Sequence, residues 1–401
     1  MKQNRWKALF WIALSQLFAL SLWFSASVIL PELREIWNLT GFTEALLTSS
    51  VPLGFIVGAL VSSFFGIADR FNARRTFAIS AFVGAVINCI ILVTNTAIVG
   101  ILLRFLTGVT LAGVYPIAVK ILAGWFPKNR GLAIGILIAA LTLGSALPHF
   151  MIVFVSSVRW EFILIVSSSL AFLASVIMYW FVNDPPTASK KTVFSFKLLR
   201  KVVQNKPVML ANYGYFGHMW ELYAMWTWLP AFLTASFIVF SPETAPWLSA
   251  LAAFLAIGVS GAIGCVAGGY IADKIGRARL TILALAGSSL CAIIIGFTFG
   301  KAIWLTLIIA MVWGVFVIAD SAQFSAAVSD FSEVEYVGTA LTFQMCIGFA
   351  ITIITIQTIP IIQSFIGWEW VFAFLSIGPI LGIISMEKLR GYEKNYKANS
   401  R

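Results

Sequence analysis

Twelve long apolar runs occupy most of this 401-residue chain. Each is about as long as the roughly 20 apolar residues that an α-helix needs to cross the hydrocarbon core of a bilayer. The runs are centred on residues 8–30, 44–67, 76–94, 97–120, 131–154, 161–182, 208–237, 246–271, 280–299, 302–327, 337–362 and 368–386. Because 60% of the residues are hydrophobic and only 11% are charged, a soluble class is excluded. The sequence therefore predicts an all-α integral membrane protein with twelve spans.

The positive charges lie mainly on one side of these predicted spans. The formal net charge is +11, and 22 of the 27 Lys and Arg residues fall in the termini and in the loops that alternate spans place together with them. Basic residues collect on the cytoplasmic side of membrane proteins. We therefore expect both termini in the cytoplasm and a lipid bilayer, not nucleic acid, as the partner of the basic residues. The short loops favour a bacterial inner membrane.

Two charged loops, one in each half of the chain, carry a similar pattern. The second follows a long apolar run and contains Gly269, Asp273, Lys274, Gly276 and Arg277. The first contains Asp69 and Arg70, so that the two aspartates are 204 residues apart (273 minus 69). Gly108 and Gly314, in the fourth and tenth runs, are separated by a similar 206 residues. This nearly constant offset indicates a duplicated unit.

The pattern G-x-x-x-D-(R/K)-x-G-R of the second loop resembles the signature loop of the major facilitator superfamily. The first loop departs from it, with Phe65, Asn72 and Ala73 where the family usually has Gly, Gly and Arg. Asn72 is a mild departure, because asparagine tolerates a left-handed backbone better than other non-glycine residues. The missing arginine is a larger one.

This resemblance covers nearly the whole chain, and it implies the fold and activity of a secondary active transporter. It implies two six-helix bundles around a central cavity that is lined mainly by spans one, four, seven and ten. Because Pro185 and Pro186 end the sixth span, we expect an N-terminal bundle over residues 1–184, a cytoplasmic linker over 185–206 and a C-terminal bundle over 207–401. In the family the two halves rock about a midplane site, and the signature loops act as a cytoplasmic gate.

Span four carries an arginine, Arg104, in an otherwise apolar run. A charged side chain there is costly in lipid, so it should face protein or water. The spacing of Arg104 and Gly108 also resembles the family's fourth-helix motif, in which the arginine is implicated in proton coupling. The alternative is that Arg104 extends to the lipid headgroups. With Thr107 in the same span and Gln16 in span one, Arg104 forms the first part of the predicted substrate and proton site.

Span seven contains His218 and Glu221, which are three residues apart and so share a helical face. A rise of about 1.5 Å per residue places both near the bilayer midplane, where ionisable residues are functional by default. We predict that both belong to the site and that Trp220 and Tyr223 line the cavity. The alternative is a hydrogen-bonded His–Glu pair that only holds helices together.

Span ten adds Trp313, Asp320 and Gln323 to the predicted site. Its polar run from Asp320 onward indicates a water-facing cavity or gate, and the alternative is a helix end at the cytoplasmic interface. Three carboxylates follow on an inner loop, Asp330, Glu333 and Glu335. They either latch onto the basic loops or are solvated, and we prefer the second interpretation.

These residues predict proton coupling but leave the substrate open. Glu221 beside His218 is costly when charged, so it binds a proton in one state and releases it in another. Arg104 with Lys120 suits an organic anion, whereas Glu221 and Asp320 among aromatic rings suit an amphipathic cation. We expect a small organic solute or metabolite. The alternatives are efflux of amphipathic drugs or siderophore-like compounds and, more remotely, a sensor that does not transport.

Other classes of function have no support in the sequence. No phosphate-binding G-x-x-x-x-G-K-[ST] loop occurs, and no nucleophile and base gather as they do in an enzyme. The four cysteines lie in apolar runs without a CxxC pair. We therefore expect a monomeric transporter, not an enzyme, that needs no cofactor or metal.

Overall fold

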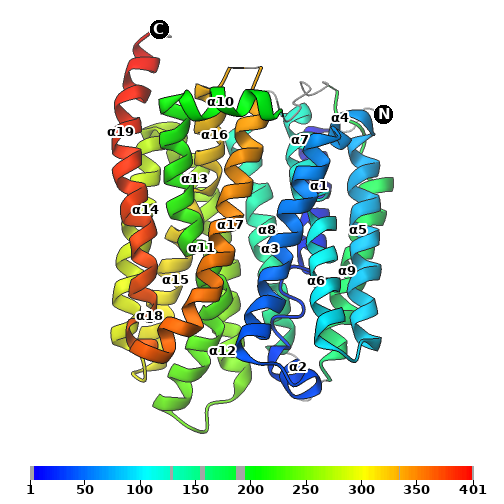
Figure 1. Cartoon of the computed structure of the whole chain (residues 1–401), viewed down its shortest axis with the longest axis vertical. Coiled ribbons are helices and arrows are strands. Elements are labelled where there is room, and N and C mark those ends of the chain that lie inside the picture. Colours follow the sequence, from blue (N-terminus) through cyan, green and yellow to red (C-terminus); the bar gives the residue numbers. More distant parts are fainter. Residues whose placement is uncertain (1–3, 127–129, 154–158, 187–194, 334, 400–401) are drawn as a thin grey trace. The chain divides into compact units, whose positions relative to one another are not determined.

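The computed structural model describes residues 4–126, 130–153, 159–186, 195–333 and 335–399. Helices make up nearly all of this part of the chain, and no strand occurs in it (Figure 1). The predicted all-α fold class is confirmed.

Eleven helical stretches in the described residues are long and apolar enough to cross a membrane, and they coincide with predicted spans two to twelve. They are Gly41–Phe64, Ala73–Val93, Ala97–Trp125, Gly131–Val153, Glu161–Trp180, Lys206–Phe240, Pro246–Ile275, Arg277–Thr298, Ile303–Phe331, Val337–Ile366 and Trp368–Glu393. The chain is a multi-pass membrane protein.

The first predicted span, over residues 8–30, differs from the prediction. Helix α1 (Arg5–Leu20) has only 16 residues, and the chain then runs through turns over residues 21–29 before α2 (Leu30–Trp37) begins. The Ser21 hydroxyl donates to the Phe18 carbonyl and the Ser25 hydroxyl reaches the Leu22 carbonyl. Such local bonds compete with helix continuation. We refer to residues 21–29 as the unwound segment.

The chain divides into two compact units. Unit 1 comprises Met1–Lys191 with Thr244–Val259, and unit 2 comprises Thr192–Glu243 with Ser260–Arg401. Helix α12 (Pro246–Ala253) and the π-helical turn η2 (Phe254–Val259) thus belong with unit 1. There the ring of Phe254 lies 4.6 Å from that of Phe150 on α8 (Arg130–Val153).

The remaining helices of unit 1 run alongside one another in Figure 1. They are α3 (Gly41–Phe64), α4 (Ile67–Arg70), α5 (Ala73–Ile90), η1 (Ile91–Val93), α6 (Ala97–Leu111), α7 (Tyr115–Trp125) and α9 (Glu161–Trp180). Small residues bring α3 and α6 together, because Gly54 faces the Phe105 backbone and Gly108 faces the Val51 carbonyl. This is the close helix approach that small residues allow in membranes.

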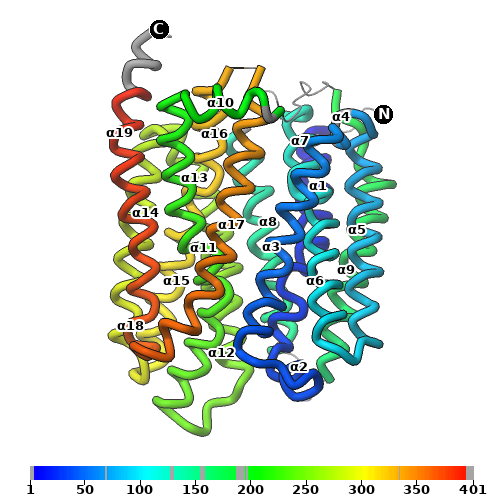
Figure 2. Tube along the Cα trace, viewed as in Figure 1, coloured from blue at the N-terminus to red at the C-terminus, as the bar shows by residue number. Residues whose placement is uncertain are grey.

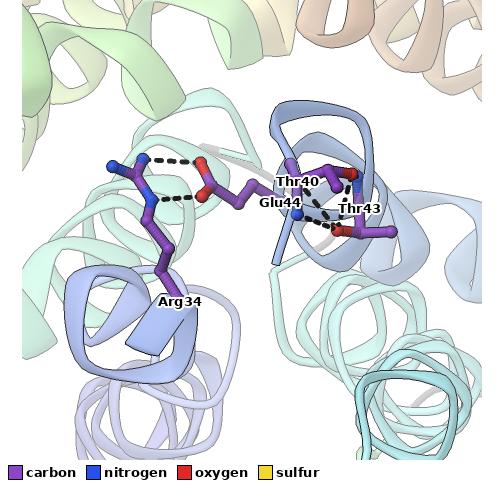
Figure 3. A network of polar contacts seen from close by, with 4 residues as sticks. All are labelled: Arg34, Thr40, Thr43 and Glu44. Atoms are coloured by element: carbon purple, nitrogen blue, oxygen red, sulfur yellow. Dashed lines mark hydrogen bonds and ion pairs between the residues drawn. The ribbon is translucent and has the colours of Figure 1, made fainter. Parts of the chain in front are cut away.

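Helix α2 covers one end of unit 1 and is fixed by contacts from the second half of the helix. The Trp37 indole N–H donates to the Thr94 carbonyl (3.1 Å), and the Arg34 guanidinium makes a two-point ion pair with Glu44 in the first turn of α3 (Figure 3). The hydrogen bond to Glu44 raises the pKa of Arg34 above its ordinary value. Thr40 and Thr43 form a reciprocal cap at the start of α3.

Unit 2 is built around the 35-residue helix α11 (Lys206–Phe240), which contacts most of its other helices. These are α10 (Phe196–Gln204), α13 (Ser260–Ile275), α14 (Arg277–Ile294), η3 (Ile295–Thr298), α15 (Ile303–Ala319), α16 (Ser321–Phe331), α17 (Val337–Ile366), α18 (Trp368–Val371), η4 (Phe372–Ser376) and α19 (Ile377–Asn399). Their course is traced in Figure 2. Gly217 on α11 faces the backbone of Gly378, so α11 and α19 approach closely.

Helix α10 lies across one end of unit 2 and makes an exposed ion pair there (Figure 1). The Lys201 ammonium lies 2.9 Å from the Glu335 carboxylate, and this hydrogen bond raises the pKa of Lys201. Glu335 is therefore solvated, as we preferred, and also forms an ion pair with the basic linker. The pair is exposed, so it contributes little to stability.

Gly54→Ala tests the α3–α6 packing. The new methyl group would overlap the Phe105 carbonyl, and we expect overpacking to cost about 1–3 kcal/mol of unfolding free energy. Gly41→Ala is the matched control, since nothing lies near its Cβ position. Thermal unfolding in detergent should show a lower Tm for the first variant only. Equal Tm values would contradict the packing.

Candidate functional site

A buried arginine lies in the interior of unit 1. The Arg104 side chain on α6 is fully shielded from solvent, and its Nη1 donates to the Leu22 carbonyl (2.9 Å), the Ser25 hydroxyl (3.1 Å) and the Asn88 Oδ1 (3.3 Å). Its Nη2 donates to the Trp23 carbonyl. Arg104 therefore faces protein, as predicted, and does not extend to the headgroups.

The unwound segment supplies most of these acceptors. A continuous first helix would use the Leu22 and Trp23 carbonyls within its own backbone. Because the helix stops at Leu20, both carbonyls are available to the guanidinium. Irregular backbone at membrane depth is tolerated where it is buried in protein, and Leu22, Trp23 and Ser25 are all buried.

Asn88 on α5 was missed by the sequence analysis. Its Oδ1 accepts from Arg104 and lies 2.9 Å from the Ser25 hydroxyl, while its Nδ2 donates to the Ser168 hydroxyl (3.0 Å) on α9. The side chain is fully buried. The one available signal was an isolated amide within the apolar third run, where buried polar groups require partners.

All partners of Arg104 are neutral. No carboxylate in the described part of the chain forms an ion pair with it, and its Nε has no hydrogen-bond partner. Buried charges are ordinarily paired with an opposite charge. Unit 1 therefore holds a positive charge that dipoles solvate but no negative charge compensates.

The other two predicted residues of unit 1 do not contact Arg104. The Thr107 hydroxyl donates to the Leu103 carbonyl of its own helix (2.8 Å). Gln16 on α1 is fully buried, and neither its Oε1 nor its Nε2 has a partner.

A buried carboxylate lies in the interior of unit 2. Glu221 on α11 is 1% exposed; its Oε2 accepts from the Ser288 hydroxyl (2.7 Å) on α14 and its Oε1 from the Trp313 indole N–H (2.8 Å) on α15. No Lys, Arg or His of the described residues forms an ion pair with it. Glu221 is thus a carboxylate held by neutral donors.

His218 has a different partner from the one expected. Its Nδ1 lies 2.9 Å from the Asp320 Oδ1, and both side chains are 1% exposed. The considered His218–Glu221 pair is therefore absent, because Asp320 reaches the histidine from the junction of α15 and α16. Asp320 is buried in unit 2, so the alternative of a helix end at the interface is wrong as well.

The aromatic and amide residues that we predicted to belong to the same site mostly make packing contacts. Trp220 packs on Phe374 with ring centroids 5.3 Å apart, and its indole N–H has no partner. Tyr223 packs against Trp226 and Phe349. Gln323 is buried on α16.

The second signature loop joins three helices of unit 2. Gly276 begins α14 with φ 95° and has no side chain to cap it, and the Glu393 carboxylate of α19 accepts instead from the Arg277 and Ala278 N–H groups (both 3.1 Å). The Arg277 Nε lies 3.0 Å from the Asp330 carboxylate on α16. Asp330 is therefore exposed to solvent, as we preferred, and also forms an ion pair with the basic loop.

The other residues of this loop make fewer contacts than Gly276 and Arg277. Asp273 and Lys274 are exposed at the end of α13, and the Lys274 ammonium lies 4.1 Å from the centre of the Tyr270 ring. Gly269 is buried.

In the first signature loop, the residue before the helix provides the N-terminal cap itself. Asn72 begins α5 with φ −63°, so our explanation of it by left-handed backbone is wrong. Its Oδ1 accepts from the Arg75 N–H (3.0 Å), and its Nδ2 donates to the Asp184 carboxylate (2.9 Å), which also faces Arg74 (3.6 Å). Asparagine is a favoured cap. Arg70 is exposed, and the Asp69 side chain lies outside the described residues.

Comparison with known proteins identifies the family. The model of the Major Facilitator Superfamily matches residues 12–356, so the chain belongs to this family, as its loops predicted. This membership agrees with the expectation that the chain is not an enzyme.

Three relatives have names that specify a solute. A Cupriavidus necator protein named as a probable sulfoacetate transporter is 23% identical over 65% of this chain and 65% of its own length. The cis,cis-muconate transport protein of Acinetobacter baylyi is 23% identical over 62% and 61%. The gallate transporter of Pseudomonas putida is 22% identical over 67% and 66%. The chain thus matches just under two thirds of the length of each relative.

Trp313→Phe tests how Glu221 is held. The change keeps the ring but removes the donor to Oε1, and we expect a buried acceptor without its partner to cost about 1–3 kcal/mol. Trp304→Phe is the matched control, because Trp304 is 64% exposed. Thermal unfolding should show a lower Tm for Trp313→Phe alone. A Tm equal to that of the control would contradict the contact.

Proposed function

We propose that this protein is a secondary active transporter that moves a small organic solute, specifically an organic anion, with protons. Alternating access between the bundles over residues 1–184 and 207–401, joined by the linker 185–206, would carry the solute. We further propose that it works as a monomer in a bacterial inner membrane with both termini in the cytoplasm.

The uncompensated charge of Arg104 is the observation that carries the choice of an anion. Its four acceptors are dipoles, so a carboxylate or sulfonate would supply the missing negative charge. The three relatives are named for sulfoacetate, cis,cis-muconate and gallate, which are all organic acids. Arg104 is fully buried here, so an anion would reach it in a state in which the surrounding backbone has moved.

The carboxylates of unit 2 are our proposed proton carriers. An ionised Glu221 without a cation is costly to bury, and a proton removes that cost. His218 and Asp320, whose Nδ1 and Oδ1 atoms lie 2.9 Å apart, are our second candidate pair of proton carriers. Protonation would bias the transport equilibrium to the extent that the states differ in proton affinity.

The signature loops are proposed as the cytoplasmic gate. Arg277 links α14 to Asp330, and Glu393 links it to α19. Asp69, Arg70, Asp273 and Lys274 would complete the gate in the states that close it.

One observation favours a second candidate function. Glu221 accepts from the Trp313 indole, and the rings of Tyr215 and Phe324 lie beside His218, the partner of Asp320. Carboxylates among aromatic rings suit an amphipathic cation. This candidate is efflux of cationic drugs or siderophore-like compounds.

Uptake into proteoliposomes separates the two candidates. The probes are four organic acids: sulfoacetate, cis,cis-muconate and gallate, for which the relatives are named, and nicotinate as a further aromatic carboxylate. We expect one or more of them to accumulate only with an inward proton gradient, and a protonophore should abolish the accumulation. Movement of a lipophilic cation with none of the four acids would reject the anion and favour efflux.

Glu221→Gln tests the proton carrier. We expect loss of proton-driven accumulation with retention of solute exchange. The amide cannot gain or lose the proton, but its single oxygen still accepts from Trp313 and its NH2 group can donate to the Ser288 hydroxyl. Glu243→Gln, at an exposed carboxylate, is the control and should behave as the wild type. Undiminished uphill uptake by Glu221→Gln would reject this role.

A further inference from the structure

Asn88 is buried at the meeting point of four chain segments. It lies on α5, accepts from Arg104 on α6, lies 2.9 Å from Ser25 in the unwound segment and donates to α9 through Ser168 and the Leu164 carbonyl (3.4 Å). Among the described side chains, Asn88 and Ser25 supply the hydrogen-bond acceptors of the guanidinium.

The two faces of the Asn88 amide have opposite requirements. Toward Arg104 the side chain must accept, since a guanidinium has only donors; toward the Leu164 carbonyl it must donate. An amide meets both, and these partners fix its orientation. A carboxylate would meet the first requirement more strongly but would face the Leu164 carbonyl with a second acceptor.

The choice of an amide has an electrostatic consequence. An aspartate at position 88 would be the obvious counter-ion for a buried arginine, because charge-assisted bonds are roughly twice as strong as neutral ones. The amide orients the guanidinium without neutralising it. The positive charge therefore remains for a ligand.

We propose that Asn88 is a positioning residue that orients Arg104 through a neutral acceptor and so keeps its charge uncompensated for an anionic solute. This inference rests on the proposed transport of organic anions. It requires the residue at position 88, which lies outside the predicted site, to be neutral.

The first experiment asks whether residues 88 and 104 are coupled. Thermal unfolding is measured for Asn88→Asp, Arg104→Gln and the double variant. We expect Asn88→Asp to lower the Tm far more in the Arg104→Gln background, because the new carboxylate then has no cation. Asn212→Asp, at a fully buried asparagine in unit 2, gives the cost of a buried carboxylate elsewhere and should not depend on Arg104. Equal effects of Asn88→Asp in both backgrounds would overturn the proposal.

The second experiment separates charge from shape. Equilibrium binding of radiolabelled sulfoacetate, muconate, gallate and nicotinate is measured on purified protein. Asn88→Asp preserves the shape and adds the charge, and should weaken binding at least about tenfold. Asn88→Gln is longer but neutral, and should bind better than Asn88→Asp. If Asn88 served only for packing, Asn88→Asp would bind better than Asn88→Gln, because aspartate keeps the shape of the side chain.

The two experiments distinguish failure of the Asn88 proposal from failure of the proposed transport of organic anions. If the wild type binds none of the four acids, the anion function fails, while the coupling experiment still decides whether Asn88 orients Arg104. If the wild type binds and Asn88→Asp binds equally well, the proposal is overturned although the function stands. If Asn88→Asp does not fold, loss of binding in a stable Asn88→Gln variant overturns it.

Discussion

The contact between Arg104 and the unwound segment is the constraint on which unit 1 depends. A guanidinium buried in an apolar bundle needs acceptors, and the first helix provides them by ending at Leu20, so that the Leu22 and Trp23 carbonyls accept from Arg104. The short α1, the turns over residues 21–29 and the separate helix α2 follow from this arrangement. The close packing of α3 and α6 through Gly54 and Gly108 supports the helix that carries Arg104. One buried charge thus accounts for the irregular course of the first predicted span.

Unit 2 contains the complementary arrangement. Glu221 on the first spanning helix of this unit accepts from the third and fourth, α14 and α15, and all its partners are neutral. In unit 1 the first, third and fourth spans also meet, because Arg104 on α6 donates to the segment after α1 and to Asn88 on α5. One unit therefore holds a guanidinium and the other a carboxyl group, and neither has an oppositely charged partner among the described residues. A transporter that binds a solute anion and a proton needs one site of each sign, and this is why the two centres support proton-coupled anion transport.

Much of the fold could be predicted because hydropathy is a local property. Eleven of the twelve predicted runs are helices of spanning length. The features that could not be predicted depend on contacts between residues far apart in the sequence. The break after Leu20 requires knowing where Arg104 lies, and the pairing of His218 with Asp320 depends on the junction of α15 and α16. Asn88 looked like one amide among many apolar residues. Asn72 was noticed for the wrong reason, since its role is a helix cap and its backbone is not left-handed.

The central claim is that the positive charge of Arg104 serves an anionic solute. The most direct measurement compares equilibrium binding of the organic acids by the wild type and by Arg104→Gln, each corrected for its folded fraction. The account predicts that Arg104→Gln loses binding of every acid that the wild type binds, because its neutral side chain cannot supply the charge. Unchanged affinity in folded Arg104→Gln would contradict the account and leave Arg104 as a structural clamp for the unwound segment.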